Sequence, residues 1–187
     1  MSAVRPLVDA AVLRREFDAS FAAPARAAAE ATEDLLALRV AGDKYVVRLA
    51  EVTGLFADRV LAPLPSAVPE FLGVISLRGV VIPAWSLGAL LGYGSDRDAM
   101  RWAILVGHRG EEQRFALLFA RFEGHLRVPR VDLASRAPEG DRAPRAHVRH
   151  SVRVSDTWCG VLALDTIAGE IERRLGLGAG NEAVKTP

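Results

Sequence analysis

Cysteine, lysine and long apolar runs are all scarce in this sequence of 187 residues. Its one cysteine, Cys159, has no partner for an intramolecular disulfide and cannot form a cysteine-based zinc site. Arg78, Pro83 and several glycines interrupt the longest apolar segments, so none approaches the roughly 20 residues of a membrane span. Neither sign of charge dominates, because 24 basic residues face 23 acidic ones. We therefore expect a soluble, cytoplasmic protein whose overall charge is not suited to a polyanionic partner.

The usual signals of catalysis are also missing. A serine nucleophile often sits in a G-x-S-x-G elbow, whereas Ser76 lies within a strand-like apolar run. His147 and His150 are three residues apart, but the further ligands that a zinc site requires are not in evident positions. A phosphate-binding loop needs a lysine beside clustered glycines, and lysine occurs only as Lys44 and Lys185. We expect no enzymatic activity, no metal and no cofactor.

Short predicted strands dominate the chain from Leu35 onward. Half of all residues are hydrophobic, and the length fits one domain or two small subdomains. Segments rich in strand-forming residues alternate with turns that contain glycine, proline or charged residues. The predicted strands are 35–40, 45–49, 59–64, 73–77, 80–84, 102–107, 115–119, 125–128 and 158–164. Many short strands in succession predict an all-β sandwich or barrel.

Two helices are predicted among the strands, at 87–91 and 165–175. The second has apolar residues at i, i+4 and i+8, and Asp165 or Thr166 is expected to cap its start. Glycines that follow it are expected to end the helix and to leave residues 176–187 as a polar, flexible tail.

Residues 1–34 differ in character from the rest of the chain, because they are alanine-rich and lack β-branched runs. Leu13, Phe17 and Phe21 recur at i, i+4 and i+8 between charged residues, which predicts a short amphipathic helix. This helix could pack on the remainder of the chain, dock into a partner's groove, or stay disordered, since short isolated helices are marginal in water. We treat this segment as a partly helical N-terminal extension.

The segment 71–87, with sequence FLGVISLRGVVIPAWSL, is the most informative part of the chain. Two apolar strands meet there at Arg78-Gly79, where glycine supplies the backbone freedom of a tight turn. The turn places the Arg78 side chain at the tip or edge of the hairpin. One exposed guanidinium on an apolar hairpin suits binding of an acidic or carbonyl-rich partner surface better than it suits catalysis. The alternative is that Arg78 is an ordinary solvated turn residue.

This segment resembles the signature of the CheW family of chemotaxis coupling proteins, which reads approximately F-[IL]-x-G-V-[IL]-N-L-R-G-x-[IV]-[IV]-P-V-[IV]-D-L. The matching residues are Phe71, Gly73, Val74, Leu77, Arg78, Gly79, Val81, Pro83 and Leu87. The likeness extends from about Leu35 to Ile171, and residues 1–33 lie beyond it. A match of this length makes a CheW-like domain at 35–175 the leading hypothesis.

The resemblance implies two intertwined five-stranded β-barrel subdomains of SH3-like type, with a shared apolar core and a groove between them. It also implies a noncatalytic cytoplasmic adaptor that links chemoreceptor tips to the regulatory domain of a histidine kinase, without nucleic acid or direct membrane contact. By position, Arg78 matches the family arginine associated with partner binding. Leu49, Val52 and Leu55 match apolar positions of the family's receptor-facing region, although each could instead be an ordinary core residue.

Four positions depart from the family pattern. Ser76 replaces an asparagine, Ser86 and Ala120 replace aspartates, and Gly54 stands where glutamate is usual. Losing acidic groups removes charge-assisted hydrogen bonds worth roughly 1.5–3 kcal/mol each when made. We expect the architecture to survive, while the partners could differ from the standard ones.

Two other functions stay open. A divergent accessory member of the family would serve a specialised sensory pathway with non-standard partners. A nucleic-acid-binding β-barrel would use the stretch 131–153, which is predicted to be a long loop with five arginines. Acidic residues dilute that charge, and the stretch contains no aromatic residue on which a base could stack.

Overall fold

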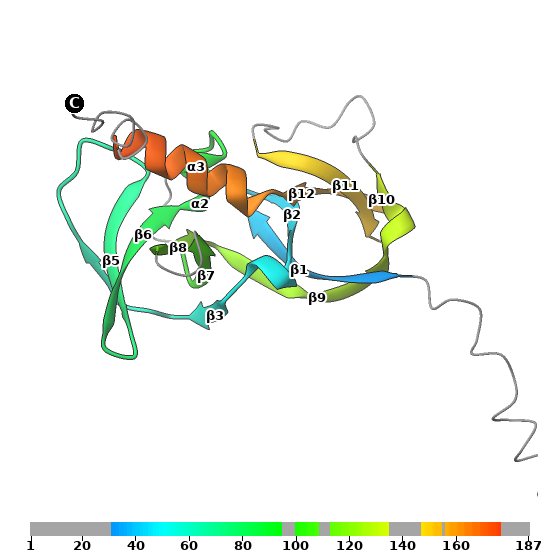
Figure 1. Cartoon of the computed structure of the whole chain (residues 1–187), viewed down its shortest axis with the longest axis horizontal. Coiled ribbons are helices and arrows are strands. Elements are labelled where there is room, and N and C mark those ends of the chain that lie inside the picture. Colours follow the sequence, from blue (N-terminus) through cyan, green and yellow to red (C-terminus); the bar gives the residue numbers. More distant parts are fainter. Residues whose placement is uncertain (1–30, 95–99, 109–112, 135–146, 155, 177–187) are drawn as a thin grey trace, which may run out of the picture. The chain divides into compact units, whose positions relative to one another are not determined.

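The computed structural model describes residues 31–94, 100–108, 113–134, 147–154 and 156–176 (Figure 1). The strands are β1 (Thr32–Val40), β2 (Asp43–Arg48), β3 (Gly54–Ala57), β4 (Leu61–Pro63), β5 (Phe71–Leu77), β6 (Val80–Ser86), β7 (Trp102–His108), β8 (Gln113–Phe119), β9 (Arg121–Pro129), β10 (Leu133–Ala134), β11 (Val148–Val154) and β12 (Thr157–Leu162). The helical elements are the 3-10 turns η1 (Leu49–Glu51) and η2 (Arg130–Asp132) and the α-helices α2 (Leu87–Leu90) and α3 (Leu164–Arg174). No helix among these residues is long and apolar enough to cross a membrane.

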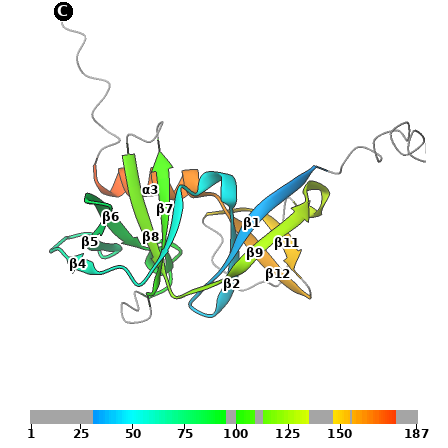
Figure 2. The ribbon, with the colours of Figure 1, turned by 90° about the horizontal axis from the view of Figure 1, so that it is seen from below.

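The strands form two six-stranded sheets, ordered β10-β11-β12-β2-β1-β9 and β3-β7-β8-β6-β5-β4. We call the first sheet subdomain A and the second subdomain B. The chain leaves A after β2, builds all of B, and returns to A where β8 runs almost directly into β9 (Figure 2). The two strands at opposite edges of each sheet are consecutive in the chain. Only three residues connect them, 130–132 in A and 58–60 in B. Each sheet must therefore curl on itself.

Three apolar clusters explain why several strands read as unbroken hydrophobic runs. The interior of A contains Leu35 and Val46, and the interior of B contains Ile75 and Leu105. A third and larger cluster is shared by strands of both subdomains and by both α-helices. A strand such as β1 therefore buries both faces, with alternate residues in the A interior and in the shared core. The shared core joins the two sheets into one folded unit.

The two subdomains have the same connectivity once the chain order is permuted. In B, strands β3 to β8 follow one another, with α2 between β6 and β7. In A, the equivalent order is β9, β10, β11, β12, α3 and then β1 and β2. Each sheet contains one parallel pair, β6 with β8 in B and β12 with β2 in A. The repeat is hidden in the sequence because the permutation splits subdomain A between the two ends of the chain.

Helix α3 is present as predicted, but its predicted cap is wrong. The helix begins at Leu164 after Ala163, so neither Asp165 nor Thr166 is its N-cap residue, although the Asp165 carboxylate accepts the Thr166 N–H at 2.8 Å inside the first turn. The Thr166 hydroxyl instead donates to the Ala163 carbonyl at 2.8 Å. The carboxylate of Glu51, in η1, accepts the Leu164 N–H at 3.4 Å. A distant acidic side chain therefore serves the positive end of this helix, which a local sequence pattern does not reveal.

The far end of α3 ties subdomain A to subdomain B. The apolar face of the helix, which includes Ile167 and Ile171, is buried in the shared core. Beyond it, Arg174 forms an ion pair with Glu70, which lies just before β5. Burial opposes ionisation of Glu70, but the hydrogen bond from Arg174, a backbone N–H and the Arg174 charge together lower the pKa of Glu70. The carboxylate therefore stays ionised and paired at neutral pH.

The all-β prediction with two interleaved subdomains is confirmed, with corrections. Each sheet has six strands instead of five, because the short strands β4 and β10 extend its edge. The predicted loop at 131–153 is wrong at both ends, where η2, β10 and β11 lie. The sequence of β11, VRHSVRV, looks loop-like because its charged residues alternate with the buried Val152 and the half-buried Val148 and Val154. Strand β3 was not predicted either.

Candidate functional site

Arg78 lies at the tip of the β5–β6 hairpin, in a tight two-residue turn. Arg78 and Gly79 have φ angles of 51° and 82°, the combination of positive values that a type I′ turn requires. An arginine at positive φ costs free energy that a glycine or asparagine would not. Its side chain is exposed and has no ion pair or hydrogen bond with any residue that the structure describes. The hairpin thus presents one free guanidinium to solvent.

The outer surface of strands β4, β5 and β6 forms an apolar patch beside this arginine. Ser76 of β5 faces Val81 of β6, and both side chains point outward while their neighbours Ile75 and Ile82 are buried. Val81 is 65% exposed, and Val60, just before β4, is 87% exposed. Strand alternation puts Val60 on this outward side, because the next residue pairs with the inward-facing Ile75. We call Val60, Ser76, Arg78 and Val81 the hairpin face.

Gly73 explains how β4 reaches its place on this face. A bulge interrupts the β5–β6 register between Phe71 and Gly73, and Gly73 has φ of 134°. A Cβ atom there would lie 2.1 Å from the carbonyl oxygen of Ala62 and 2.8 Å from Cα of Pro63. Real Cβ atoms essentially never approach so closely. Only glycine allows β4 to pack against β5 at this point.

The other predicted site residues lie at the rim of the shared core. Leu49, in η1, is 40% exposed, whereas Val52 and Leu55 are half-buried and pack against the shared core. Two aromatic residues join them there. Trp102 in β7 and Phe122 in β9 are also half-buried, and their rings are 5.2 Å apart. We call these five residues the apolar rim.

Sequence reasoning missed Trp102 and Phe122 as members of this rim. The β3–β7 register places Leu55 opposite Ile104 and Ala57 opposite Trp102, so Leu55 and Trp102 point to the same face. Phe122 is the first half-buried residue in the alternating pattern of β9, RFEGHLRVP. That alternation could have identified Phe122 as a residue on the inward face of β9. The pairing of β3 with β7, which brings Leu55 and Trp102 to one face, cannot be predicted without the tertiary fold.

The structure accounts for Gly54, one of the four departures from the family pattern. A Cβ atom on Gly54 would lie 2.7 Å and 2.9 Å from two ring carbons of Phe56. The Phe56 ring thus occupies the space that a side chain at position 54 would need. The guanidinium of Arg59 lies 5.4 Å from the centre of the same ring, within cation–π distance. A packed aromatic group replaces a carboxylate at this edge of subdomain B.

Ser86 also has a structural explanation. Ser86 is fully buried, and its hydroxyl accepts the Ala89 N–H at 3.1 Å. Serine therefore caps α2 as an aspartate would, without burying a charge. Ala120 lies between β8 and β9 and lines a cavity with Gly88. The fourth departure, Ser76, lies on the hairpin face.

The remaining candidate residues have structural contacts. Cys159 is buried in the interior of subdomain A, as expected for a small apolar side chain. His147, expected in a solvated loop, is 8% exposed and its Nδ1 lies 3.1 Å from the Thr166 hydroxyl. His150 is in β11, and its Nδ1 lies 3.2 Å from Arg48. The predicted docking helix with Leu13, Phe17 and Phe21 lies outside the described residues. No group of three potential metal ligands occurs in the described parts of the chain.

Many described arginines are paired with acidic residues. The ion pairs include Arg101–Asp58, Arg127–Asp34, Arg149–Asp165 and Arg153–Asp156. Two of them, at Arg149 and Arg153, belong to the arginine-rich stretch that sequence analysis considered for nucleic-acid binding. Their charges are already balanced, so this part of the stretch offers little free positive charge to a phosphate backbone.

The hairpin face and the apolar rim can bind, but the residues that form them offer no acid–base pair. Each combines exposed or half-buried apolar side chains with a rigid sheet beneath, and the hairpin face adds one unpaired cation. Such surfaces bury apolar area against a partner and use the charge for orientation and specificity. The geometry therefore suits protein–protein contact.

Comparison with known proteins gives a consistent result. Residues 34–172 match the family model described as CheW-like domain. The chemotaxis protein CheW of Rhizobium meliloti (strain 1021) is 33% identical over 73 residues, which cover 39% of this chain and 47%, about half, of that relative. The crystal structure of the scaffolding protein TtCheW from Thermoanaerobacter tengcongensis superposes with a TM-score of 0.63 at 18% identity, covering 73% of this chain and 92% of that one. At that identity the second likeness concerns the fold alone.

Proposed function

Because this chain belongs to the CheW-like domain family, we propose that it is a noncatalytic signalling adaptor of the chemotaxis type. In this role it couples the cytoplasmic tips of chemoreceptors to the regulatory domain of a histidine kinase, and it works in the cytoplasm. The observation that carries the proposal is the hairpin face, where Arg78, which matches the arginine of the family signature by position, is exposed, unpaired among the described residues and flanked by exposed valines.

We assign the kinase to the hairpin face. Val60 and Val81 are 87% and 65% exposed, so a partner that covers them removes apolar area from water. Arg78 stands at the end of this patch, where its guanidinium can donate several hydrogen bonds to a carboxylate or to carbonyl groups. Its turn fixes the backbone at positive φ, so the side chain is displayed on a rigid support. A flat apolar patch with one oriented cation fits the rigid sheet surface of another β-barrel domain.

We assign the receptor tip to the apolar rim. Helical partners dock by laying apolar side chains at helical spacing into a hydrophobic strip. Val52, Leu55, Trp102 and Phe122 all pack at the edge of the shared core, and Leu49, whose carbonyl accepts the Val52 N–H, adds an exposed leucine in η1. The two aromatic rings supply large contact area at low entropic cost.

Affinity capture from the native cytoplasm tests this function. The purified full-length protein is immobilised, and the retained proteins are identified by mass spectrometry. The proposal predicts a histidine kinase and a receptor-type coiled coil, with at least tenfold less kinase retained by Arg78→Glu. Arg130→Glu, which changes another exposed arginine by the same charge, should retain both partners, and circular dichroism should show both variants folded. Capture of neither partner, or equal kinase capture by Arg78→Glu, contradicts the assignment.

A divergent accessory role is the second candidate, and the replacement of three acidic family positions by Gly54, Ser86 and Ala120 favours it. In that case the fold is kept while the partner set has changed. Deletion of residues 1–30, which leaves β1 and the Glu33–Arg48 ion pair intact, separates the two candidates. An unchanged partner set after deletion supports the ordinary coupling role, whereas loss of a partner specific to this chain supports the accessory role.

A further inference from the structure

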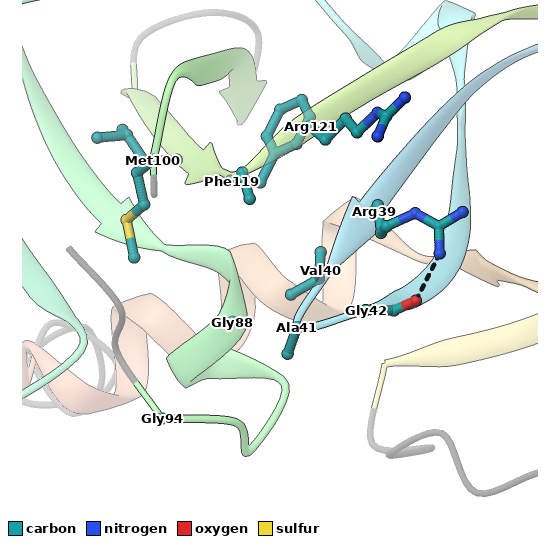
Figure 3. A pocket seen from close by; sticks show the side chains of 11 residues that line it. Arg39, Val40, Ala41, Gly42, Gly88, Gly94, Met100, Phe119 and Arg121 are labelled. Atoms are coloured by element: carbon teal, nitrogen blue, oxygen red, sulfur yellow. Dashed lines mark hydrogen bonds between the residues drawn. The ribbon is translucent and has the colours of Figure 1, made fainter. Parts of the chain in front are cut away.

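A cavity of about 300 Å³ lies between the β1–β2 turn of subdomain A and the α2 region of subdomain B. Figure 3 shows it between Met100, Phe119, Val40 and the backbone of Gly88, with two arginine side chains on one side. Neither the hairpin face nor the apolar rim contributes a residue to it. The cavity is therefore separate from both surfaces, and the proposed function does not use it.

The cavity is remote from both proposed partner surfaces. Strand β6 runs from the Arg78 turn to Ser86, so the hairpin tip and the cavity lie at opposite ends of a seven-residue strand. Strand β2 likewise separates Gly42, which lines the cavity, from Leu49 of the apolar rim. At about 3.3 Å per residue, each separation is roughly 20 Å. A ligand in the cavity could bind while both other surfaces are occupied.

The walls of the cavity are apolar and mostly small. Aliphatic, aromatic and thioether side chains form part of the lining, and glycines, alanines and two arginines form the rest. The lining includes Val40, Gly88, Met100, Phe119 and Ala120. The volume is at the lower end of the range for ligand sites, and the cavity is open on one side. It therefore accommodates one large apolar side chain better than a whole drug-sized molecule. Buried anchors of this kind contribute most of the affinity at many protein interfaces.

The mouth of the cavity carries excess positive charge. Arg39 and Lys44 are cross-strand neighbours, and both contact Glu123, at 2.7 Å and 3.9 Å respectively. Arg121, two residues before Glu123 on β9, is exposed and makes no ion pair with any described residue. Among the described residues beside the opening, the cations Arg39, Lys44 and Arg121 outnumber the carboxylates of Glu123 and Asp43, and Asp43 already accepts the Tyr93 hydroxyl. This imbalance favours a ligand that brings negative charge.

Hydrogen bonds connect the segments that flank the cavity. The Tyr93 hydroxyl donates to the Asp43 carboxylate at 2.5 Å and lies 2.8 Å from the Tyr45 hydroxyl. These bonds join the segment after α2 to the start of β2, across the boundary between the subdomains. Arg39 also donates to the Gly42 carbonyl at 2.8 Å, which braces the β1–β2 turn (Figure 3). A preformed cavity loses little entropy on binding, so even one anchor side chain can give measurable affinity.

We propose that this cavity is a third docking site, which accepts an acidic segment of a partner protein through one large apolar anchor side chain. The anchor fills the space between β1, α2 and β8. Carboxylates next to the anchor pair with Arg121 and with the Arg39–Lys44–Glu123 cluster. The site recognises a combination of shape and charge that neither the hairpin face nor the apolar rim offers.

A labelled synthetic peptide tests the site on the full-length protein. The probe is a fluorescein-labelled octapeptide with one phenylalanine flanked by glutamate and aspartate. Two matched peptides replace the acids by their amides or the phenylalanine by alanine. We expect saturable binding by fluorescence anisotropy, with binding about tenfold weaker without the ring and about three- to tenfold weaker without the acids. In ¹⁵N–¹H spectra of the protein, the largest chemical-shift changes on adding peptide should occur at the amides of Gly42, Gly88 and Gly94.

Two variants and a control make the test specific. Arg121→Glu should weaken the acidic peptide about tenfold, and Ala120→Leu, which extends a side chain from the cavity wall, should abolish saturable binding. Arg130→Glu, in η2 just beyond the far end of β9, should change binding less than twofold. Absence of binding, equal binding of the amide peptide, or shifts centred elsewhere overturns the proposal. Because Arg78 takes no part, such a result leaves the adaptor function untouched.

Discussion

Replacement of Gly73 by alanine is expected to destabilise the protein far more than an ordinary surface change. Gly73 has φ of 134°, a region that L-residues rarely adopt. The added Cβ would lie 2.1 Å from the Ala62 carbonyl oxygen and 2.9 Å from the backbone N of Leu64. These are backbone atoms, so they cannot swing aside as a flexible side chain would. Strand β4 has to move away from β5.

The loss in free energy of unfolding that we expect for Gly73→Ala has two parts. Holding alanine in the disfavoured backbone region costs about 1–3 kcal/mol. Displacing β4 weakens its pairing with β5 at Leu61–Ile75, Ala62–Val74 and Pro63–Gly73, and each lost hydrogen bond costs about 1 kcal/mol. We therefore expect a total loss of about 3–5 kcal/mol. That is a large fraction of the stability of a typical domain.

Urea unfolding of the wild type and of two glycine variants measures the effect. Gly169 lies inside α3, and a Cβ there would meet nothing within 4 Å. Gly169→Ala should therefore stabilise the protein by about 0.5–1 kcal/mol, because alanine is the better helix former. If Gly73→Ala is as stable as the wild type, or loses less than about 1 kcal/mol, the steric reasoning is refuted.

Three further predictions concern stability. Burial, and then the charges of Arg174 and Arg173, lower the pKa of His147, so the unfolded state binds the proton more tightly than the folded state. The free energy of unfolding should therefore fall as the pH drops through about 6.5. His147→Gln should remove this pH dependence when urea unfolding is measured from pH 7.5 to 5.5. Arg174→Gln should cost about 1–2 kcal/mol at pH 7. Because the pKa of Glu70 is lowered by this pair, the difference should shrink as the pH falls below the ordinary range of a glutamate and the folded-state carboxylate becomes protonated. Ala41→Asn should raise the melting temperature by a few degrees, since Ala41 has φ of 48° and asparagine tolerates that region better.

Much of the fold could be predicted from the sequence, because most strands carry local signals. The β5–β6 hairpin has an Arg-Gly turn between two apolar runs, and the β1–β2 hairpin has an Ala-Gly turn. Strands with both faces buried, such as β1 and β8, stand out as continuous apolar segments. These signals are short-range, so they survive in a single sequence.

The failures occurred where long-range contacts decide the structure. Strand β11 carries arginines and a histidine, and it becomes a strand because β10 and β12 pair with both of its edges. The start of α3 is served by Glu51, which lies 113 residues earlier in the chain. Neither relationship leaves a local pattern. The permuted repeat is invisible for the same reason.

The candidate site likewise combines features that local sequence predicts with features that depend on long-range contacts. The position of Arg78 at an exposed tip follows from the Arg-Gly turn, and the structure places it there. The exposure of Val60 and Val81 beside it depends on how β4 crosses β5, which the sequence does not reveal. Trp102 and Phe122 come together from different sheets, and the third docking cavity lies where the two subdomains meet. Sites at junctions between sheets cannot be predicted until the tertiary fold is known.

Direct binding of the purified chain to the regulatory domain of its captured histidine kinase is the most direct test of the central claim. Isothermal titration compares the wild type with Arg78→Glu and Arg78→Lys. We predict saturable binding by the wild type, a loss of at least tenfold for Arg78→Glu, and an intermediate loss for Arg78→Lys, because lysine keeps the charge without the planar fork of donors. Equal affinities for all three folded proteins would show that the hairpin face is not the kinase-binding surface.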